Sequence, residues 1–266
     1  MKLKLFKPRT NPYKAIRLHY YRTKGSCPAR LNGEYFRCDP EHWRFWEKAS
    51  TGRWEPQTYD ILSKFLTGSS VYCDVGAWIG PTVLYAARQC RKVICFEPDF
   101  VAYRYLLWNL ELNGLTNVTP FNVALSDAPG MVQMAGPGES LGDSCTSLLS
   151  AEGRANAFEV LGLSWDRWMA LVRPEPIDFM KIDIEGFEFD LLPRIADFLS
   201  DRKPIVFLST HGQMVEPDKQ SESMQRIVDV MSCYQRCLDP DMNEVAWDDL
   251  TKQPICGSSR EFLFLP

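Results

Sequence analysis

Charged and apolar residues alternate in the segment 177–192, "IDFMKIDIEGFEFDLL". Lys181, Asp183 and Glu185 are separated by single apolar residues, so in a β-strand their side chains lie on one face. Central strands of a parallel sheet are covered on both faces, and buried charges there need partners or a task. This spacing predicts a functional site at the end of a strand.

A second candidate site lies in "VYCDVGAWIG", residues 71–80. An apolar run ends in Asp74, Gly76 and Gly80, and a helix-like segment follows. Glycines let the backbone approach a ligand, and the free N–H groups of a helix start hold anionic groups. The pattern predicts a strand that leads into a ligand-binding turn, with a purely structural turn as the alternative. Trp78 is unusual there: it is either a plug over the helix start, which we favour, or an apolar wall beside a ligand.

A third candidate residue is Glu97 in "VICFEPD", twenty-three residues after Asp74. An acid in this position after a second strand typically binds a ribose diol. A dinucleotide site would have G-x-G-x-x-G, but Asp74 occupies the first glycine position, and its charge opposes a pyrophosphate. A cofactor with positive charge, such as S-adenosylmethionine, is favoured. An NAD(P)-dependent oxidoreductase on a similar sheet is the alternative.

A fourth candidate, His211, ends the strand-like "PIVFLSTHG" and is one of three histidines. The carboxyl ends of parallel strands meet at one edge of a sheet, so His211 is expected near Asp183. A packed, non-catalytic histidine is the alternative interpretation.

The elements that position these residues alternate between strand and helix patterns, which is typical of a doubly wound, mostly parallel α/β sheet. We predict strands near 71–75, 92–97, 117–124, 177–184 and 204–210, and helices near 80–90, 99–113, 160–172 and 188–200. Two further strands near 234–239 and 261–266 predict a hairpin-like edge. The Gly/Ser-rich stretch 134–154 is predicted to be a long loop, and its role as a lid is left open.

The chain of 266 residues is predicted to contain a basic extension, residues 1–52, and one large domain, residues 53–266. Asn32 and Gly33 between short alternating runs predict a β-hairpin in the extension. Ten Lys or Arg residues against one acid in residues 1–38 contrast with a net charge of −4 for the chain. This basic arm is the only indication of an anionic surface, and no nucleic-acid partner is predicted.

Composition and cysteine use bear on the compartment. Apolar residues make up 45% and charged residues 24%, as in ordinary soluble domains. The nine cysteines form no C-x-x-C pair, and we interpret them as reduced, buried thiols. With no secretory pattern and no long apolar run, we predict a cytoplasmic protein, with contact at the inner face of a membrane through the basic arm as an open possibility.

At these residues the sequence resembles the FkbM-type methyltransferases, a branch of the class I S-adenosylmethionine-dependent enzymes. The matching pieces occur in the family's order over about residues 53–212: "WEPQTYDIL", "VYCDVGAWIG", "VICFEPD", "NLELNGL", "NVALSDAPG" and "IDFMKIDIEGFEFDLL". The resemblance implies a seven-stranded sheet with an antiparallel last strand, and S-adenosylmethionine as the cofactor.

The resemblance also implies roles for individual residues. The methionine end of the cofactor would lie against Asp74, Gly76, Ala77 and Gly80, and Glu97 would hold the ribose. The adenine would be bordered by Pro98, Asn122 and Val123. Glu55 and Thr58 would contribute from the preceding helix, and Asp183 would face the sulfonium and the acceptor.

The family's usual reaction is O-methylation of a hydroxyl on a sugar, glycolipid, polysaccharide or macrolide. The hydroxyl proton must leave as its oxygen attacks the methyl carbon, so the reaction needs in-line positioning and a proton acceptor. The candidate catalytic residues are Asp183, His211 and Lys181, and His211 is favoured as the acceptor because its ordinary pKa, about 6.5, is near working pH. This chain departs from the family at two places: the family often has an acidic residue on the strand that ends here at His211, and often has Asn at the position of Trp78. A non-catalytic module of a glycan assembly complex is a further alternative.

A metal site is an alternative at the same residues. Asp183, Glu185 and His211 could together hold a divalent cation and a sugar diol. Because their spacing is not a recognised ligand signature, we predict no metal.

Overall fold

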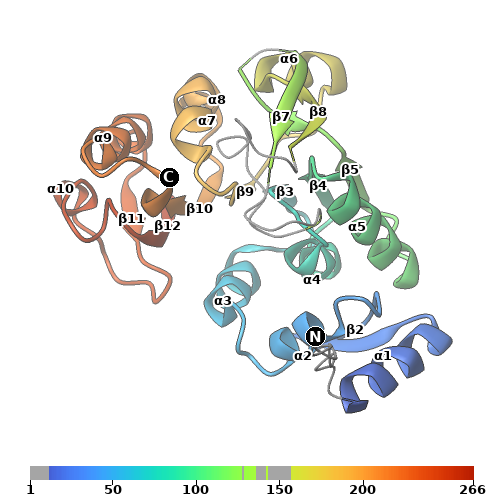
Figure 1. The fold of residues 1–266 in the computed structure, drawn as a ribbon. Helices are drawn as coiled ribbons and strands as arrows, with labels where there is room; N and C mark the ends of the chain where they lie inside the picture. The colour runs from blue at the N-terminus through green and yellow to red at the C-terminus, as the bar shows by residue number, and fades with distance from the viewer. Residues whose placement is uncertain (1–11, 128, 136–141, 143–156) are drawn as a thin grey trace, which may run out of the picture. The chain divides into compact units, whose positions relative to one another are not determined.

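The computed structural model describes residues 12–127, 129–135, 142 and 157–266 (Figure 1). The chain divides into two compact units, Met1–Pro56 and Gln57–Pro266. No helix in the described ranges is long and apolar enough to cross a membrane. All eight cysteines in these ranges are free thiols, and Cys145 lies outside them.

The first unit contains two helices and a hairpin: α1 (Pro12–Lys24), β1 (Cys27–Leu31), β2 (Glu34–Cys38) and α2 (Trp43–Ser50). Leu31 pairs with Glu34, so the turn consists of Asn32 and Gly33. Both turn residues have positive φ, 43° and 91°, as a tight two-residue hairpin requires. The predicted hairpin is therefore confirmed.

Buried polar contacts tie the hairpin to α2. The fully buried Asp39 accepts hydrogen bonds from Trp46 Nε1 at 2.9 Å and from the His42 backbone N–H at 3.0 Å. The Trp46 contact, together with the ring contact between Phe45 and Trp54, explains why aromatic residues are concentrated around α2.

The second unit is built around a seven-stranded sheet of order β11-β12-β10-β9-β3-β4-β5. β12 is antiparallel to β10 and β11, and the other pairs are parallel. The strands are β3 (Val71–Val75), β4 (Lys92–Phe96), β5 (Val118–Phe121), β9 (Phe179–Ile182), β10 (Ile205–His211), β11 (Arg236–Leu238) and β12 (Ser259–Leu265). The predicted doubly wound α/β sheet with an antiparallel last strand is confirmed.

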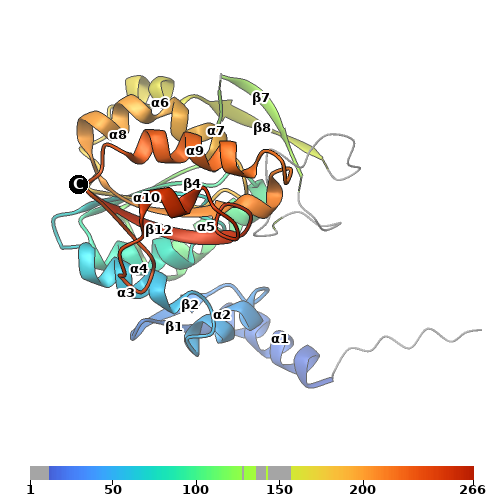
Figure 2. The same cartoon turned by 90° about the vertical axis from the view of Figure 1, so that its left-hand side faces the viewer.

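Helices cover both faces of this sheet (Figure 2). One face carries α3 (Pro56–Phe65), α4 (Pro81–Gln89) and α5 (Phe100–Leu112). The other packs its apolar side chains against α6 (Trp165–Val172), α7 (Glu188–Arg194), α8 (Ala196–Arg202), α9 (Gln220–Met231) and α10 (Trp247–Leu250), and the 3-10 turn η2 (Gly212–Met214) follows β10.

Local sequence sets the starts of the helices beside the site. Gly80 is the residue before α4, with φ of +90°, and Pro81 occupies the first turn of the helix, where its missing N–H costs nothing. Asp99 caps α5 by accepting hydrogen bonds from the backbone N–H groups of Val101 and Ala102.

A three-stranded sheet of order β6-β8-β7 was not predicted. It consists of β6 (Ala124–Leu125), β7 (Gly130–Met134) and β8 (Phe158–Leu163). The helix expected at 160–172 is wrong at its start, because residues 158–163 form β8, in which burial rises at every second residue. The predicted helix at 188–200 is two helices that meet at Ile195, after Pro193. Most of the predicted loop 134–154 lies outside the described residues.

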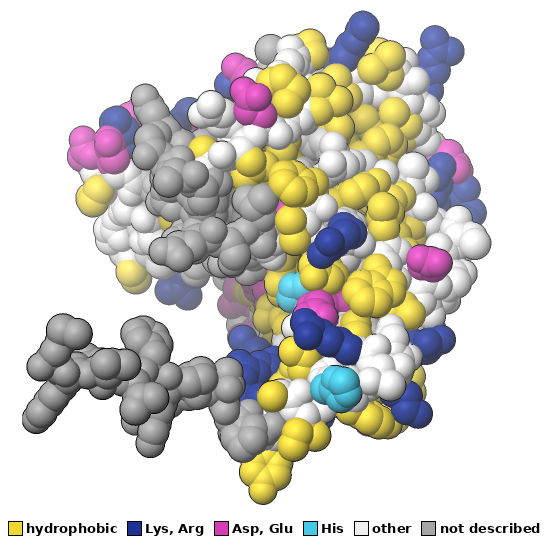
Figure 3. Space-filling model, turned by 45° about the vertical axis from the view of Figure 1, so that its right-hand side comes forward, with side chains coloured by type: hydrophobic (Ala, Val, Ile, Leu, Met, Phe, Trp, Pro, Cys, Tyr) yellow, Lys and Arg dark blue, Asp and Glu magenta, His cyan; other side chains and the backbone are white. Residues whose placement is uncertain are grey.

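Apolar side chains are also exposed on the small sheet. Met131 of β7 and Leu161 of β8 are register partners, and 61% and 50% of their surfaces are exposed. Figure 3 shows one face of the molecule, on which hydrophobic side chains lie among separate Lys and Arg side chains.

Candidate active site

The tips of β3 and β9 meet closely at Gly76. This residue has φ of +95°, and a Cβ atom placed on it would lie 1.9 Å from the carbonyl oxygen of Asp183. Only glycine fits both the backbone conformation and this approach. Gly76 is therefore required for the close approach of Asp183 to the predicted loop.

A cavity opens at the ends of β3, β4 and β9. Five predicted cofactor residues line it: Gly76, Glu97, Pro98, Val123 and Asp183. Its other walls include the apolar side chains of Phe96, Leu125, Met134 and Phe187, and also Trp78 and Glu185. The cavity thus has an extended apolar wall with carboxylates at separate places.

Glu97 is a buried carboxylate held by the backbone. Its Oε2 accepts the Trp78 N–H at 2.7 Å, and its Oε1 accepts the Asp99 N–H at 2.8 Å. Burial raises the pKa of Glu97 to about 8, although both N–H donors act to lower it. A carboxylate so placed accepts hydrogen bonds from a ribose diol when it is ionised.

Trp78 is a wall of the cavity, contrary to the plug that the sequence analysis favours. Its φ of +48° is left-handed, which is uncommon for a bulky residue. The indole Nε1 donates to the carbonyl oxygen of Gly142 at 3.0 Å. The side chain is therefore fixed at both its backbone and its ring.

Asp74 lies inside the sheet and is not part of the cavity wall. It is fully buried, and its Oδ2 accepts hydrogen bonds from Tyr72 Oη at 2.9 Å and Thr82 Oγ1 at 2.5 Å. Its Oδ1 has no hydrogen-bond partner among the described residues. Burial raises the pKa of Asp74, and the charge of Lys181 on the neighbouring strand partly opposes this.

Several other predicted cofactor residues support the loop and do not line the cavity. The Ala77 N–H donates to the Phe96 carbonyl at 3.0 Å. A Cβ on Gly80 would lie 2.5 Å from Leu106 of α5, so this glycine serves the packing of α5 at the start of α4. The Asn122 amide donates to the Glu97 carbonyl at 2.8 Å.

The two residues expected from the preceding helix lie in different units. Thr58 is fully buried on α3, and it does not line the cavity. Glu55 belongs to the first unit. Their contact with the cofactor stays a prediction.

The predicted catalytic residues gather at the ends of β9 and β10. Lys181 Nζ donates to Asp183 Oδ2 at 2.8 Å, and His211 Nε2 is 3.6 Å from Asp183 Oδ1. Burial acts to raise the pKa of Asp183, but Lys181 and His211 outweigh it and lower that pKa below its ordinary value. Asp183 is therefore ionised beside the cavity.

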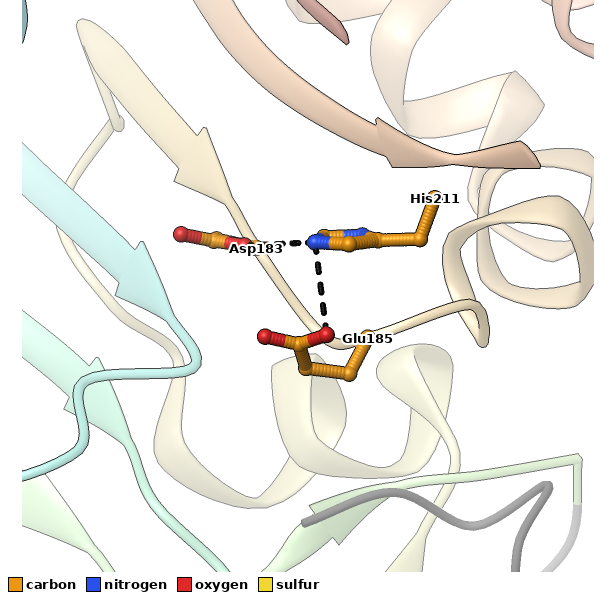
Figure 4. Close-up of side chains that lie close together, drawn as sticks. All are labelled: Asp183, Glu185 and His211. Carbon is orange, nitrogen blue, oxygen red and sulfur yellow. Dashed lines mark ion pairs between the residues drawn. The ribbon is translucent and has the colours of Figure 1, made fainter. Parts of the chain in front are cut away.

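His211 is surrounded by carboxylates. Its Nε2 is 3.5 Å from Glu185 Oε2, and its Nδ1 is 3.2 Å from Glu188 Oε1 (Figure 4 shows the Asp183 and Glu185 side). Burial acts to lower the pKa of His211, but Glu188, Asp183 and Glu185 raise it to about 9. At neutral pH the metal-free imidazole is therefore protonated, and the expectation that it works near its ordinary pKa is wrong.

Sequence reasoning missed three residues of this cluster. The buried Glu188 accepts hydrogen bonds from the Gly186 backbone N–H at 2.8 Å and from the His211 backbone N–H at 2.6 Å. Ser209 precedes His211 by two residues, and Glu261 of β12 is its register partner. The alternation of Ser209 with His211 was a usable signal for the serine, whereas Glu261 is brought there only by strand pairing.

The seven-stranded sheet has the fold of the class I methyltransferases, and a cavity lies at the carboxyl ends of its central parallel strands. The model of the methyltransferase FkbM domain matches residues 74–238. The chain therefore belongs to the FkbM methyltransferase family. No curated protein matches it in sequence.

Three of the solved structures that are similar to this chain are methyltransferases of low sequence identity. FkbM methyltransferase of Methylobacillus flagellatus KT is 16% identical, covers 74% of this chain and has a TM-score of 0.47; this chain spans 44% of its length. Pyrococcus abyssi tRNA (uracil-54, C5)-methyltransferase, in complex with S-adenosyl-L-homocysteine, is 15% identical, covers 90% of this chain and has a TM-score of 0.43; this chain spans 44% of its length. TYW2 of M. jannaschii, in complex with AdoMet, is 14% identical, covers 90% of this chain and has a TM-score of 0.42; this chain spans 84% of its length.

The residues present fit S-adenosylmethionine, the cofactor of this family's methyl transfer. Glu97 offers a buried carboxylate to a ribose, and the wall around Phe96 and Leu125 offers an apolar surface to an adenine. Asp74 does not line the cavity, so its contact with the cofactor stays a prediction.

Proposed function

We propose that the protein is an S-adenosylmethionine-dependent O-methyltransferase that acts on a hydroxyl of a carbohydrate, a glycolipid or polysaccharide, or a related natural product. The observation that carries this proposal is the position of Asp183. It lines the cavity beside Gly76 and also contacts the charged cluster formed with Lys181 and His211. A polar acceptor group at this place meets an ionised carboxylate directly.

The cofactor side of the site follows from the same cavity. Glu97 holds the ribose hydroxyls, while Pro98 and Val123 border the adenine. When bound, S-adenosylmethionine supplies an electrophilic methyl carbon on a sulfonium. The backbone at Gly76 and the Trp78 ring restrict where that end of the cofactor lies, and the apolar walls exclude water from it.

On the acceptor side, Asp183 accepts the hydrogen bond of the attacking hydroxyl and orients its oxygen toward the methyl carbon. His211, whose metal-free pKa is about 9, carries a proton, so it stabilises the Asp183 carboxylate and does not take the hydroxyl proton itself. Lys181 holds the other oxygen of the carboxylate at 2.8 Å. The proton acceptor is therefore Asp183, in place of the favoured histidine.

The test uses S-adenosylmethionine with a ¹³C-labelled methyl group and a panel of sugars, glycolipids and amines. We expect an O-methyl carbon resonance in a hydroxyl-bearing product. An Asp183→Asn variant should lose at least about 100-fold in kcat while it binds S-adenosylhomocysteine like the unmodified protein. Transfer to amines alone would refute O-methylation, and cofactor binding without any turnover would favour the non-catalytic alternative.

The oxidoreductase alternative is disfavoured by the site. Asp74 occupies the first glycine position of a dinucleotide motif and is fully buried there. Binding of NAD with quenching of tryptophan fluorescence, and no binding of S-adenosylhomocysteine, would reverse this conclusion.

The basic arm bears on where the acceptor is met. We propose that Lys2, Lys4, Lys7, Arg9, Lys14 and Arg17 hold the protein at an anionic membrane where lipid-linked sugars are made, at the cytoplasmic face. The first four lie outside the described residues, and Arg17 pairs with Glu47 at 2.8 Å. Sedimentation with anionic liposomes tests this, comparing the unmodified chain with a variant in which the first four are Gln. Equal pelleting of both would refute it.

A further inference from the structure

The spacing of ligand atoms around His211 is unusual for hydrogen bonds. Nε2 lies 3.6 Å from Asp183 Oδ1 and 3.5 Å from Glu185 Oε2, whereas charge-assisted N–H···O bonds are about 2.7–2.9 Å long. Figure 4 shows both carboxylates directed at the same ring nitrogen. One ligand atom from each of the three residues lies within 4.8 Å of the others.

The two separations from His211 Nε2, 3.6 and 3.5 Å, match atoms that share one cation. Two ligand atoms, each about 2.1 Å from a metal and about 110° apart, are roughly 3.4 Å from each other. The three side chains come from the tip of β9, the turn after it and the end of β10, so the fold places them around one point. Three protein ligands leave further coordination positions open.

The other side of the imidazole has the partner that a metal-binding histidine needs. His211 Nδ1 is 3.2 Å from Glu188 Oε1, which also accepts the His211 backbone N–H at 2.6 Å. Glu188 is fully buried, and the Gly186 N–H holds its second oxygen. Metal-binding histidines typically donate their second N–H to a carboxylate in this way, which directs the Nε2 lone pair at the metal.

A second, independent observation lies next to the three residues. Ser209 Oγ is buried and makes no hydrogen bond of ordinary geometry to a described residue, although it is close enough to Asp183 to help lower the pKa of that carboxyl. Ser209 lies on the same face of β10 as His211, and its partner Glu261 adds another carboxylate to that face. The site therefore holds a buried hydroxyl that lacks a well-formed hydrogen bond, and more carboxylates than the nearby Lys181 can balance.

We propose that Asp183, Glu185 and His211 bind one divalent transition-metal cation, with Glu188 orienting the imidazole. Imidazole and carboxylate ligands together suit Mn²⁺ or Zn²⁺. The proposal departs from the sequence-based expectation of no metal. It goes beyond the proposed methyl transfer: the cation would take the place of the proton that His211 carries in the metal-free protein, so a positive charge would remain beside Asp183. Because Asp183 and Glu185 also line the cavity, the open positions of the cation are available to an oxygen of the acceptor.

The test is direct binding of Mn²⁺ to the full chain after removal of metals with EDTA and dialysis. Loss of the free-Mn²⁺ electron paramagnetic resonance signal during titration should show one bound ion per chain. Glu185→Gln and Glu188→Gln should each weaken binding by at least about tenfold. Glu159→Gln, at an exposed carboxylate of β8, is the matched control and should bind like the unmodified chain.

Circular dichroism of each variant shows that it is folded before binding is compared. The proposal is overturned if the unmodified, folded chain binds Mn²⁺ no more tightly than about 1 mM. It is also overturned if Glu185→Gln binds as tightly as Glu159→Gln. Either outcome leaves the cavity and methyl transfer untouched, because neither measurement depends on the cofactor.

Discussion

Replacement of Glu97 by Gln should change how cofactor binding depends on pH. The pKa of Glu97 is about 8 in the free protein because the carboxyl is buried. If only the ionised form accepts the ribose hydroxyls well, roughly one molecule in a hundred is competent at about pH 6. Binding should therefore tighten about 100-fold between pH 6 and pH 9, mostly below pH 8, and level off above it.

The assay is isothermal titration calorimetry with 5′-methylthioadenosine, which has the ribose diol but no amino acid that titrates in this range. Glu97→Gln should bind with the same affinity at every pH, and about 10- to 100-fold more weakly than the unmodified protein at pH 9. Glu111→Gln, which removes an exposed carboxylate at the end of α5, is the control and should keep the pH dependence.

The same pKa has a consequence for folding stability. An acid whose folded pKa lies above its ordinary value, 4.5, is penalised as pH rises, because the unfolded chain ionises first. This destabilisation of the folded state is absent below about pH 4.5 and reaches about 4 to 5 kcal/mol above pH 8. Gln does not titrate, so the Glu97→Gln variant should become more stable relative to the unmodified protein as pH rises from about 4.5 to 8. The raised pKa of Glu97 is refuted if the affinity of the unmodified protein for 5′-methylthioadenosine changes less than threefold between pH 6 and 9.

Three further changes test the loop and its surroundings. Gly76→Ala should lower the free energy of unfolding by more than about 3 kcal/mol in urea, because the new Cβ meets the Asp183 carbonyl at 1.9 Å; a smaller loss would contradict that contact. Trp78→Asn introduces a residue type that tolerates positive φ, so stability should change little while cofactor affinity falls about tenfold. Unchanged affinity would favour the interpretation of Trp78 as a structural plug. Thr82→Val should cost about 1–3 kcal/mol, since it removes a hydrogen bond to buried Asp74, and an exposed Thr119→Val change serves as its control.

Local patterns predicted most of the central sheet. The apolar run before Asp74 forms a fully buried strand, and Asn32 with Gly33 forms the hairpin turn, because both features depend on neighbours in sequence. The prediction of helix at the start of β8 is wrong, since the alternating burial there arises from pairing with β6 and β7. A pairing partner distant in sequence outweighs weak local preference.

The candidate site was predicted in part for the same reason. Asp183 and His211 were expected at one edge because parallel strands end together, and they lie 3.6 Å apart. Their titration could not be predicted. The pKa of His211 rises because Glu188 and Glu185 reach it from the turn and helix after β9, a geometry with no counterpart in residue spacing.

By itself, the sequence determined the class of fold, the family and the residues that end each central strand, since these follow from periodicity, glycine positions and short motifs. Only the tertiary structure decided which of those residues share a cavity. It moved Asp74 and Gly80 into supporting positions and made Trp78 a wall. The physical reason is that burial, charge and close backbone approach depend on segments far apart in the chain, so they exist only once the sheet is assembled.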